Sequence, residues 1–221
     1  MSQSGMTVVR VADIEWEDRI NVDNWPSRAG MYYDNRDLDL CIRLIDYPVG
    51  SVEPRHVHAG MHATTLLKGR AIVDGKTLGP LDVILGPSNE PHGPLDYPDG
   101  CILLSAFQGS YFHSEVETLS TEKQYRLIQH EELPFESRGR DTGAVKTLVD
   151  RGLGRLLLEA WRFAPGESIK PRFLAALVVD GAPEVDGQTL GTWDFIHANG
   201  REAAGTIAFP KGGTLLTVTM R

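Results

Sequence analysis

The 221-residue chain is poor in cysteine, in long apolar runs and in clustered positive charge. Its two cysteines, Cys41 and Cys101, lie inside apolar segments, so we expect reduced core residues and not a disulfide framework. No apolar run approaches the ~20 residues that span a bilayer. The first residues lack the charged-then-apolar order of a signal peptide. These absences argue against a membrane or secreted protein and favour the cytoplasm.

The net charge and the content of turn-forming residues further limit the kinds of partner and fold that the sequence suggests. The formal net charge is −8 and no block of Lys and Arg is present, so nucleic acid is not an expected partner. The 23 glycines and 13 prolines suit short strands that are joined by tight turns. The composition therefore predicts a compact, mostly β protein.

Four histidines stand at spacings that suggest a metal site. His56 and His58 alternate along an expected strand, so their side chains point to one face. His62 follows closely, and His92 ends a later segment that is rich in turn residues. Neutral imidazole binds Zn, Fe, Cu and Ni. We predict that folding gathers these four side chains as the ligands of one metal ion inside a small barrel.

The stretch from Gly50 to Gly69 resembles the first motif of the cupin family. That motif is Gly, five residues, His-x-His, three or four residues, Glu, six residues, Gly, and here only His62 departs from it, in the Glu position. The second motif, Pro-x-Gly-x-x-His, resembles residues 87–92, with Asn89 in place of Gly. Asn tolerates a left-handed backbone better than most residues. The resemblance implies a jelly-roll barrel with an all-histidine metal site.

The chain also contains an internal repeat. Residues 69–84 recur 112 positions later as residues 181–196, and nine of the sixteen positions are identical. Both copies carry an Asp-Gly pair between apolar residues, at 74–75 and 186–187, which is a hairpin signal. A duplicated unit predicts two similar folds in tandem. We expect an all-β protein of two tandem cupin (double-stranded β-helix or jelly-roll) barrels.

The predicted domains are residues 1–125 and 126–221. The first is a metal-binding barrel with an N-terminal arm, and the second is a degenerate barrel without a metal site. In the second copy Arg172 and Leu174 occupy the positions of the His-x-His pair, and Ala204 that of the last histidine. The second barrel is therefore expected to be a scaffold, a dimerisation surface or a lid.

The expected strands of the first barrel follow the apolar segments between turn residues. Residues 1–30 are expected to form an arm of one short strand and loops. The strands are expected at 38–47, 51–58, 63–74, 82–85 and 101–108.

The stretch from His56 to Arg70 is similar to cupin dioxygenases that cleave carbon–carbon bonds in diketones and hydroxylated ketones. Those enzymes use a non-haem Fe(II) held by histidines alone, as Lewis acid and template. The resemblance implies a small carbonyl or phenolic substrate and one divalent transition metal, with Fe(II) favoured and Mn, Ni or Zn as the other ions. Glu90 is the candidate catalytic base. The expected cavity walls are Met61, Thr65, Leu67, Phe107 and Tyr111.

Other functions stay open at this level. A metal-dependent lyase or isomerase with Mn or Ni would suit the same histidines, and so would a non-catalytic sensor or regulatory bicupin. A closed tetrahedral zinc site would indicate a structural role. We also expect a homodimer, because pairing would cover exposed edge strands. Architecture alone does not choose among these functions.

Overall fold

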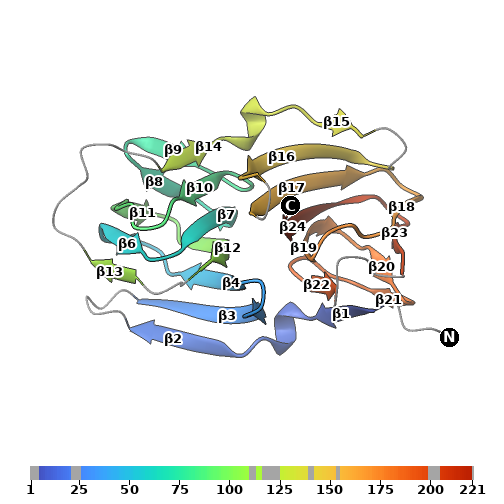
Figure 1. Ribbon diagram of the computed structural model, residues 1–221, viewed down its shortest axis with the longest axis horizontal. Coiled ribbons are helices and arrows are strands. Elements are labelled where there is room, and N and C mark those ends of the chain that lie inside the picture. Colours follow the sequence, from blue (N-terminus) through green and yellow to red (C-terminus); the bar gives the residue numbers. More distant parts are fainter. Residues whose placement is uncertain are drawn as a thin grey trace. The chain divides into compact units, whose positions relative to one another are not determined.

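The computed structural model describes residues 5–20, 26–109, 113–115, 125–138, 142–152, 155–198 and 205–220. Within these residues the chain consists of antiparallel β-strands and two short 3-10 helices, η1 (Val11–Asp13) and η2 (His130–Glu132), with no α-helix (Figure 1). The chain divides into two compact units, Glu15–His130 and a second unit formed by Met1–Ile14 together with Glu131–Arg221. The all-β class predicted from the sequence is confirmed.

The unit Glu15–His130 contains three sheets. Its largest sheet has seven strands, in the order β14 (Arg126–Ile128), β10 (Val83–Gly86), β7 (Met61–Gly69), β12 (Cys101–Gln108), β4 (Leu40–Tyr47), β3 (Pro26–Asn35) and β2 (Trp16–Ile20). A four-stranded sheet has the order β5 (Ser51–Glu53), β11 (Leu95–Tyr97), β8 (Ala71–Val73) and β9 (Lys76–Leu78). The third sheet pairs β6 (His56–His58) with β13 (His113–Glu115).

The second unit contains two sheets. Its seven-stranded sheet has the order β1 (Met6–Val9), β22 (Phe195–Ala198), β19 (Ala175–Gly181), β24 (Gly213–Met220), β17 (Leu156–Phe163), β16 (Ala144–Asp150) and β15 (Glu136–Ser137). Its four-stranded sheet has the order β18 (Glu167–Ile169), β23 (Ile207–Phe209), β20 (Glu184–Val185) and β21 (Gln188–Thr189). The strand orders of the two units correspond position by position.

The two predicted hairpins illustrate this correspondence. Val73 pairs with Lys76 across the turn between β8 and β9, and Val185 pairs with Gln188 across the turn between β20 and β21. Asp74 and Asp186 both have a φ of 50°, and the glycine after each is also left-handed. Two successive left-handed residues form the tight turn that matches the twist of a hairpin. Both Asp-Gly predictions are confirmed.

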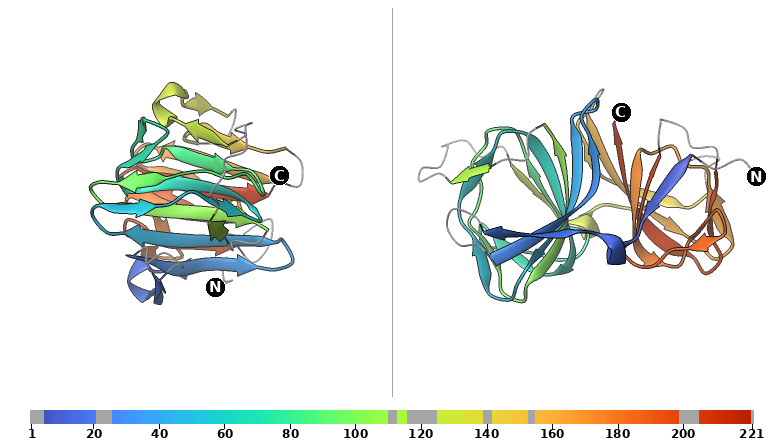
Figure 2. Two further views of the ribbon diagram at one scale, coloured as in Figure 1. Left: turned by 90° about the vertical axis from the view of Figure 1, so that its left-hand side faces the viewer. Right: turned by 90° about the horizontal axis from the view of Figure 1, so that it is seen from below.

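Each unit places its core between its seven-stranded and its four-stranded sheet, and Figure 2 shows the strands of each unit curving around an interior. In the unit Glu15–His130, Ile45, Leu66 and Leu103 from the large sheet pack with Val73 and Tyr97 from the small sheet in one buried cluster. This packing removes apolar side chains from water, which is the main stabilising term of such a fold.

The structure corrects three parts of the sequence-based prediction. Residues 16–20 and 26–30, expected to be part of an arm, form β2 and the first half of β3. These strands carry many charged side chains, so no apolar run marks them. The first strand of the chain, β1, pairs with β22 through Met6↔Ala198 and belongs to the second unit, whereas the sequence grouped it with residues 1–125. The strand predicted at 51–58 is broken at Pro54, which has no backbone N–H to donate.

Candidate metal centre

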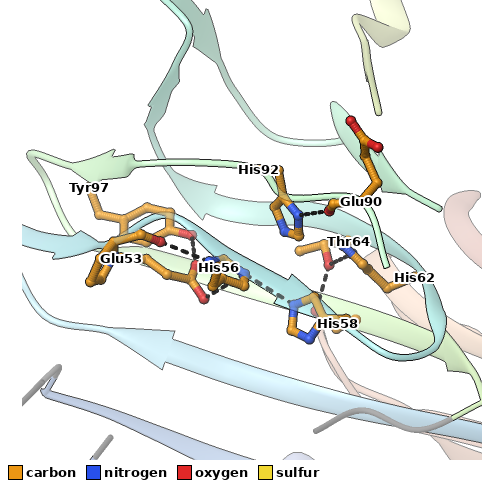
Figure 3. Close-up of polar contacts among 10 residues, drawn as sticks. Glu53, His56, His58, His62, Thr64, Glu90, His92 and Tyr97 are labelled. Carbon is orange, nitrogen blue, oxygen red and sulfur yellow. Dashed lines mark hydrogen bonds and ion pairs between the residues drawn. The ribbon is translucent and has the colours of Figure 1, made fainter. Parts of the chain in front are cut away.

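The four predicted histidines come from neighbouring parts of the unit Glu15–His130. His56 and His58 lie on β6, whose alternation turns both rings to the same side. His62 lies at the start of β7, and His92 lies between β10 and β11. The backbone N–H groups of His56 and His92 each donate to the carbonyl of the other residue, at 2.9 Å. This bridge fixes the second histidine segment against β6. Figure 3 shows the side chains of the four histidines.

Asn89 shapes the segment that carries His92. Its φ is 59°, in the left-handed region, which confirms that Asn takes the backbone conformation expected at the glycine position of the motif. Its N–H donates to the carbonyl of His58 at 2.7 Å. The turn is therefore tied to the strand that carries the His-x-His pair.

Three of the four histidines converge closely. One ring nitrogen each of His56, His58 and His92 lies within 4.8 Å of the other two, and the Nε2 atoms of His56 and His58 are 3.1 Å apart. All three side chains are buried. Ligand atoms about 2 Å from one metal ion lie about 3 Å apart in adjacent positions, so this spacing suits a shared ion.

Backbone carbonyls fix the tautomers of two of these rings. The Nδ1 of His56 lies 2.8 Å from the carbonyl oxygen of Pro54, and the Nδ1 of His92 lies 3.2 Å from that of Glu90. Because a carbonyl oxygen only accepts, each Nδ1 carries a hydrogen and each Nε2 offers a lone pair. Burial lowers the pKa of both His56 and His92 to about 4. Both rings are therefore neutral near pH 7, which is the form that binds metals.

His62 lies beside this group and is held differently. Its ring centroid is 4.7 Å from that of His58 and 4.8 Å from that of His92. Its Nδ1 lies 3.1 Å from the hydroxyl of Thr64, which in turn lies 2.9 Å from the hydroxyl of Ser105. Burial, and then the neighbouring histidines, lower its pKa well below the usual range.

The Nε2 of His62 is buried and has no hydrogen-bond partner. It lies against the backbone of Gly86, so closely that a Cβ at position 86 would overlap it. A buried nitrogen without a partner is costly in a finished core, and a nearby cation would compensate for it. The neutral imidazoles and this nitrogen together fit a divalent transition metal.

Glu90, the predicted base, is buried but differently oriented. Its backbone carbonyl accepts from the Nδ1 of His92, whereas Figure 3 shows its carboxylate pointing away from the histidines. The structure thus gives Glu90 a role in orienting His92 through the main chain.

The sequence reading missed another carboxylate, that of Glu53 at the end of β5. Its Oε1 lies 3.5 Å from the Nε2 of His56, and its Oε2 accepts a hydrogen bond of 2.9 Å from the hydroxyl of Tyr97 (Figure 3). Burial, followed by the charge of Glu53, raises the pKa of Tyr97 well above its usual value. The alternation of β5, with Ser51 and Glu53 buried and Val52 exposed, is the sequence signal that could have found it.

A cavity of about 30 Å³ opens among these side chains, enough for about one water-sized group. Phe107 lines it, as predicted, whereas Met61, Thr65 and Leu67 do not; Tyr111 lies outside the described residues. The full lining consists of Ile45, Tyr47, Glu53, His56, His58, His62, Thr64, Ile84, His92, Leu95, Tyr97, Leu103, Ser105 and Phe107.

The second unit offers no comparable group among its described residues, since His56, His58 and His92 form the one metal-compatible cluster found in the described parts of the chain. Leu174 is buried and Arg172 is exposed; Ala204 lies outside the described residues. His197 lies on β22, and burial lowers its pKa. No helix among the described residues is long and apolar enough to span a membrane.

No family model matches the chain, and no curated protein matches its sequence. Solved structures do match. A proposed dioxygenase from Nostoc punctiforme PCC 73102 gives a TM-score of 0.80 at 13% identity, over 96% of this chain and 82% of that one. Oxalate decarboxylase from Lactobacillus farciminis, in a formate complex, gives 0.67 at 12% identity, over 97% and 86%. A mutant of the Bacillus subtilis oxalate decarboxylase gives 0.63 at 13% identity, over 96% and 76%. At such low identities these likenesses establish a shared fold.

Proposed function

We propose that this protein is a metal-dependent enzyme of the cupin superfamily, built from two tandem cupin barrels with its metal centre in the unit Glu15–His130. The observation that carries the proposal is the convergence of three buried, neutral imidazoles, those of His56, His58 and His92, beside a cavity. The matching strand orders of the two units support the tandem arrangement.

The favoured reaction is that of a non-haem dioxygenase acting on a small carbonyl or phenolic compound, with Fe(II) as the favoured ion. A bound metal would supply Lewis acidity and a template for the substrate. The chain contributes the dry surroundings: Ile84, Leu95 and Phe107 line the cavity and limit water near the reacting atoms. The likeness to a proposed dioxygenase agrees with this choice.

A metal-dependent lyase is the second candidate, and the shared fold with oxalate decarboxylases favours it. Such an enzyme would use the same imidazoles with Mn or Ni and would act on a small carboxylate. The two candidates differ in whether oxygen is consumed.

The test begins with the metal content of protein purified without a histidine tag, followed by oxygen uptake over a panel of diketones and phenols. Stoichiometric iron with oxygen uptake supports the dioxygenase. Mn or Ni with anaerobic release of carbon dioxide from small carboxylates supports the lyase. Zinc that resists chelators, with neither activity, would indicate a structural or sensory site and contradict an enzyme.

Two histidine variants sharpen the test. His58→Ala removes one of the converging nitrogens, so both stoichiometric metal and activity should be lost. His197→Ala, in the second unit, changes a histidine that is not in the cluster and should keep both. Equal effects of the two changes would contradict the assignment of the metal to the first unit.

A further inference from the structure

A chain of hydrogen bonds runs along one wall of the cavity. The Nδ1 of His62 lies 3.1 Å from the hydroxyl oxygen of Thr64 (Figure 3), which lies 2.9 Å from that of Ser105. All three residues line the cavity. Ser105 is only 1% exposed, and Thr64 is the one hydrogen-bond partner of its hydroxyl among the described residues. The chain therefore starts at an imidazole and ends at a buried hydroxyl beside the cavity.

The direction of this chain follows from its donors and acceptors. A hydrogen on the Nε2 of His62 would lack an acceptor, because that nitrogen is buried without a partner against Gly86. A hydrogen on Nδ1 is accepted by the hydroxyl of Thr64, so Nδ1 is the nitrogen that carries it. Thr64 then donates to Ser105, and the hydrogen of Ser105 is left without an acceptor among the described residues. A buried donor of this kind is costly, and an oxygen atom of a bound ligand would accept from it.

A buried positive charge stands next to the last hydroxyl of the chain. In the large sheet Ser105 pairs with Thr64 of β7 on one side and with Arg43 of β4 on the other. Arg43 lies two residues before Ile45, which lines the cavity, so the alternation of the strand turns both side chains to the interior. Arg43 is only 5% exposed, and its guanidinium is always charged. Because a charge acts more strongly in such an interior than in water, it favours a negatively charged oxygen at Ser105 over a neutral one.

The corresponding row of the second unit lacks both features. Its strands β17, β24 and β19 carry Glu159, Thr217 and Ala176 in this row. Ala176 has no hydroxyl, and the hydroxyl of Thr217 donates to the backbone carbonyl of Glu159 at 3.3 Å. The carboxylate of Glu159 forms an ion pair with Arg138. Of the two rows, the one that ends in a donor beside a buried cation is therefore the row in the unit with the converging histidines.

We infer that Ser105 and Arg43 form an oxyanion subsite in the cavity, and that the substrate is an organic anion whose carboxylate, enolate or phenolate oxygen binds there. The inference rests on the proposed function, because it names the substrate class of the same site. Ser105 donates its hydrogen bond to the anionic oxygen. Arg43 supplies the charge that selects an anion. Thr64 is a positioning residue, because it accepts from His62 and thereby turns its own hydrogen to Ser105.

The test is a titration of the Co(II)-loaded full chain with formate, followed by the visible absorption of the ion. Formamide is the neutral probe of matching shape. Ser105→Ala should raise the dissociation constant of formate about tenfold to a hundredfold, as expected for a lost hydrogen bond to a charged group, whereas Ser105→Thr keeps the hydroxyl and should bind formate like the wild type. Arg43→Gln should weaken formate and leave formamide unchanged. Ser51→Ala is the matched control, because Ser51 is also a buried serine of this unit but donates to the carbonyl of Pro48 and does not line the cavity.

Failure of the subsite and failure of the metal centre give different results. If the wild type binds Co(II), but Ser105→Ala binds formate as tightly as the wild type does or no spectrum responds to formate, the inference is overturned and the metal centre stands. If the wild type binds no Co(II), the proposed function fails. The melting temperature of the metal-free chain then tests the subsite, since a rise with formate that Ser105→Ala abolishes supports it and the absence of a rise overturns it.

A structure decides if Ser105→Ala does not fold, as judged by circular dichroism. The wild type is then crystallised with formate. A formate oxygen within about 3 Å of the hydroxyl oxygen of Ser105, the reach of a hydrogen bond, supports the inference. A cavity in which no formate oxygen reaches Ser105 overturns it.

Discussion

Burial governs the protonation of single residues in this site. His56 and His92 lie in a nearly water-free interior, so the charged form of each loses its hydration and the pKa of each falls to about 4. The carbonyls of Pro54 and Glu90 act in the opposite direction but more weakly. The fold therefore presents metal-binding nitrogens at pH values where an exposed histidine would be protonated.

The metal-free protein should lose stability between pH 6.5 and pH 4. In this window the unfolded chain protonates His56 and His92, whereas the folded chain does not, so the free energy of unfolding falls as the pH falls. The pKa values of about 4 correspond to a loss of roughly 3 kcal/mol for each histidine across the window. Urea unfolding of chelator-treated protein at pH 7, 6 and 5 measures this slope.

The variant His92→Gln provides the control for this slope. It removes one titrating group, so its stability should depend less on pH over the same range, while its value at pH 7 reports the cost of the substitution itself. An unchanged slope would mean that other groups cause the pH dependence.

At the scale of single residues, the sequence-based predictions were correct where only a few residue types can adopt the required backbone conformation. The left-handed Asn89 and the two Asp-Gly turns are examples, because few residues take that backbone conformation. The cavity walls were predicted less well. His62 and Thr64 face the cavity but Thr65 does not, since a slip of one residue along a strand turns every side chain to the opposite face.

Between elements, strands β7 and β10 approach each other closely at the site. His62 is the register partner of Gly86, and its ring occupies the space where a Cβ would stand. Gly86→Ala should therefore force the ring or the strands to move and lower the free energy of unfolding by roughly 1–3 kcal/mol. Chemical denaturation measures the change.

Gly79→Ala is the matched control in the same unit. An added Cβ at Gly79 meets nothing within 4 Å, so the free energy of unfolding should stay within about 0.5 kcal/mol of the wild type. If both alanines cost the same, the overlap with His62 is not the cause.

Two equivalent aspartates tie an added strand to each large sheet. Asp82 accepts from the backbone N–H of Gly79 and of His130, both at 2.8 Å, beside β14. Asp194 accepts in the same way from Gly191, at 2.9 Å, and from Val11, at 3.0 Å, beside β1. These two residues are identical in the sequence repeat, and the structure shows why both copies need a carboxylate there.

Asp194→Ala should loosen β1 from β22. The change leaves two backbone donors without acceptors and removes the ion pair with Arg10, so we expect a loss of roughly 2–4 kcal/mol. Hydrogen exchange of the amides of Met6–Val9 should quicken. Glu184→Ala, at an exposed position of β20, should change neither measurement, and equal exchange in both variants would contradict this role.

The sequence predicts some of the strand arrangement but not all of the strand pairings. The repeat predicted two similar units, and the strand orders agree with it. The partner of β1 could not be predicted. The strands β1 and β22 are far apart in the sequence, and the residues of a short strand do not indicate which distant strand it pairs with. The broken strand around Pro54 also brought Glu53 and His56 together in a way that spacing does not show.

For the whole molecule, the metal and the fold should be linked, because the three converging histidines come from β6 and from the segment after β10. An ion that binds only the folded chain raises its stability by mass action. At a concentration of one hundred times the dissociation constant the gain is about 2.7 kcal/mol, or roughly 5–10 °C in the melting temperature of a chain of this size.

Differential scanning calorimetry of the full chain tests this linkage, with and without chelator and with the native metal restored. His58→Ala should abolish the shift, because it removes a nitrogen of the cluster, whereas His197→Ala should keep it, because the second unit lacks such a cluster among its described residues. If the melting temperature of the wild type changes neither with chelator nor with added metal, the imidazoles converge without binding an ion. The histidines would then have to be explained by packing and hydrogen bonding alone.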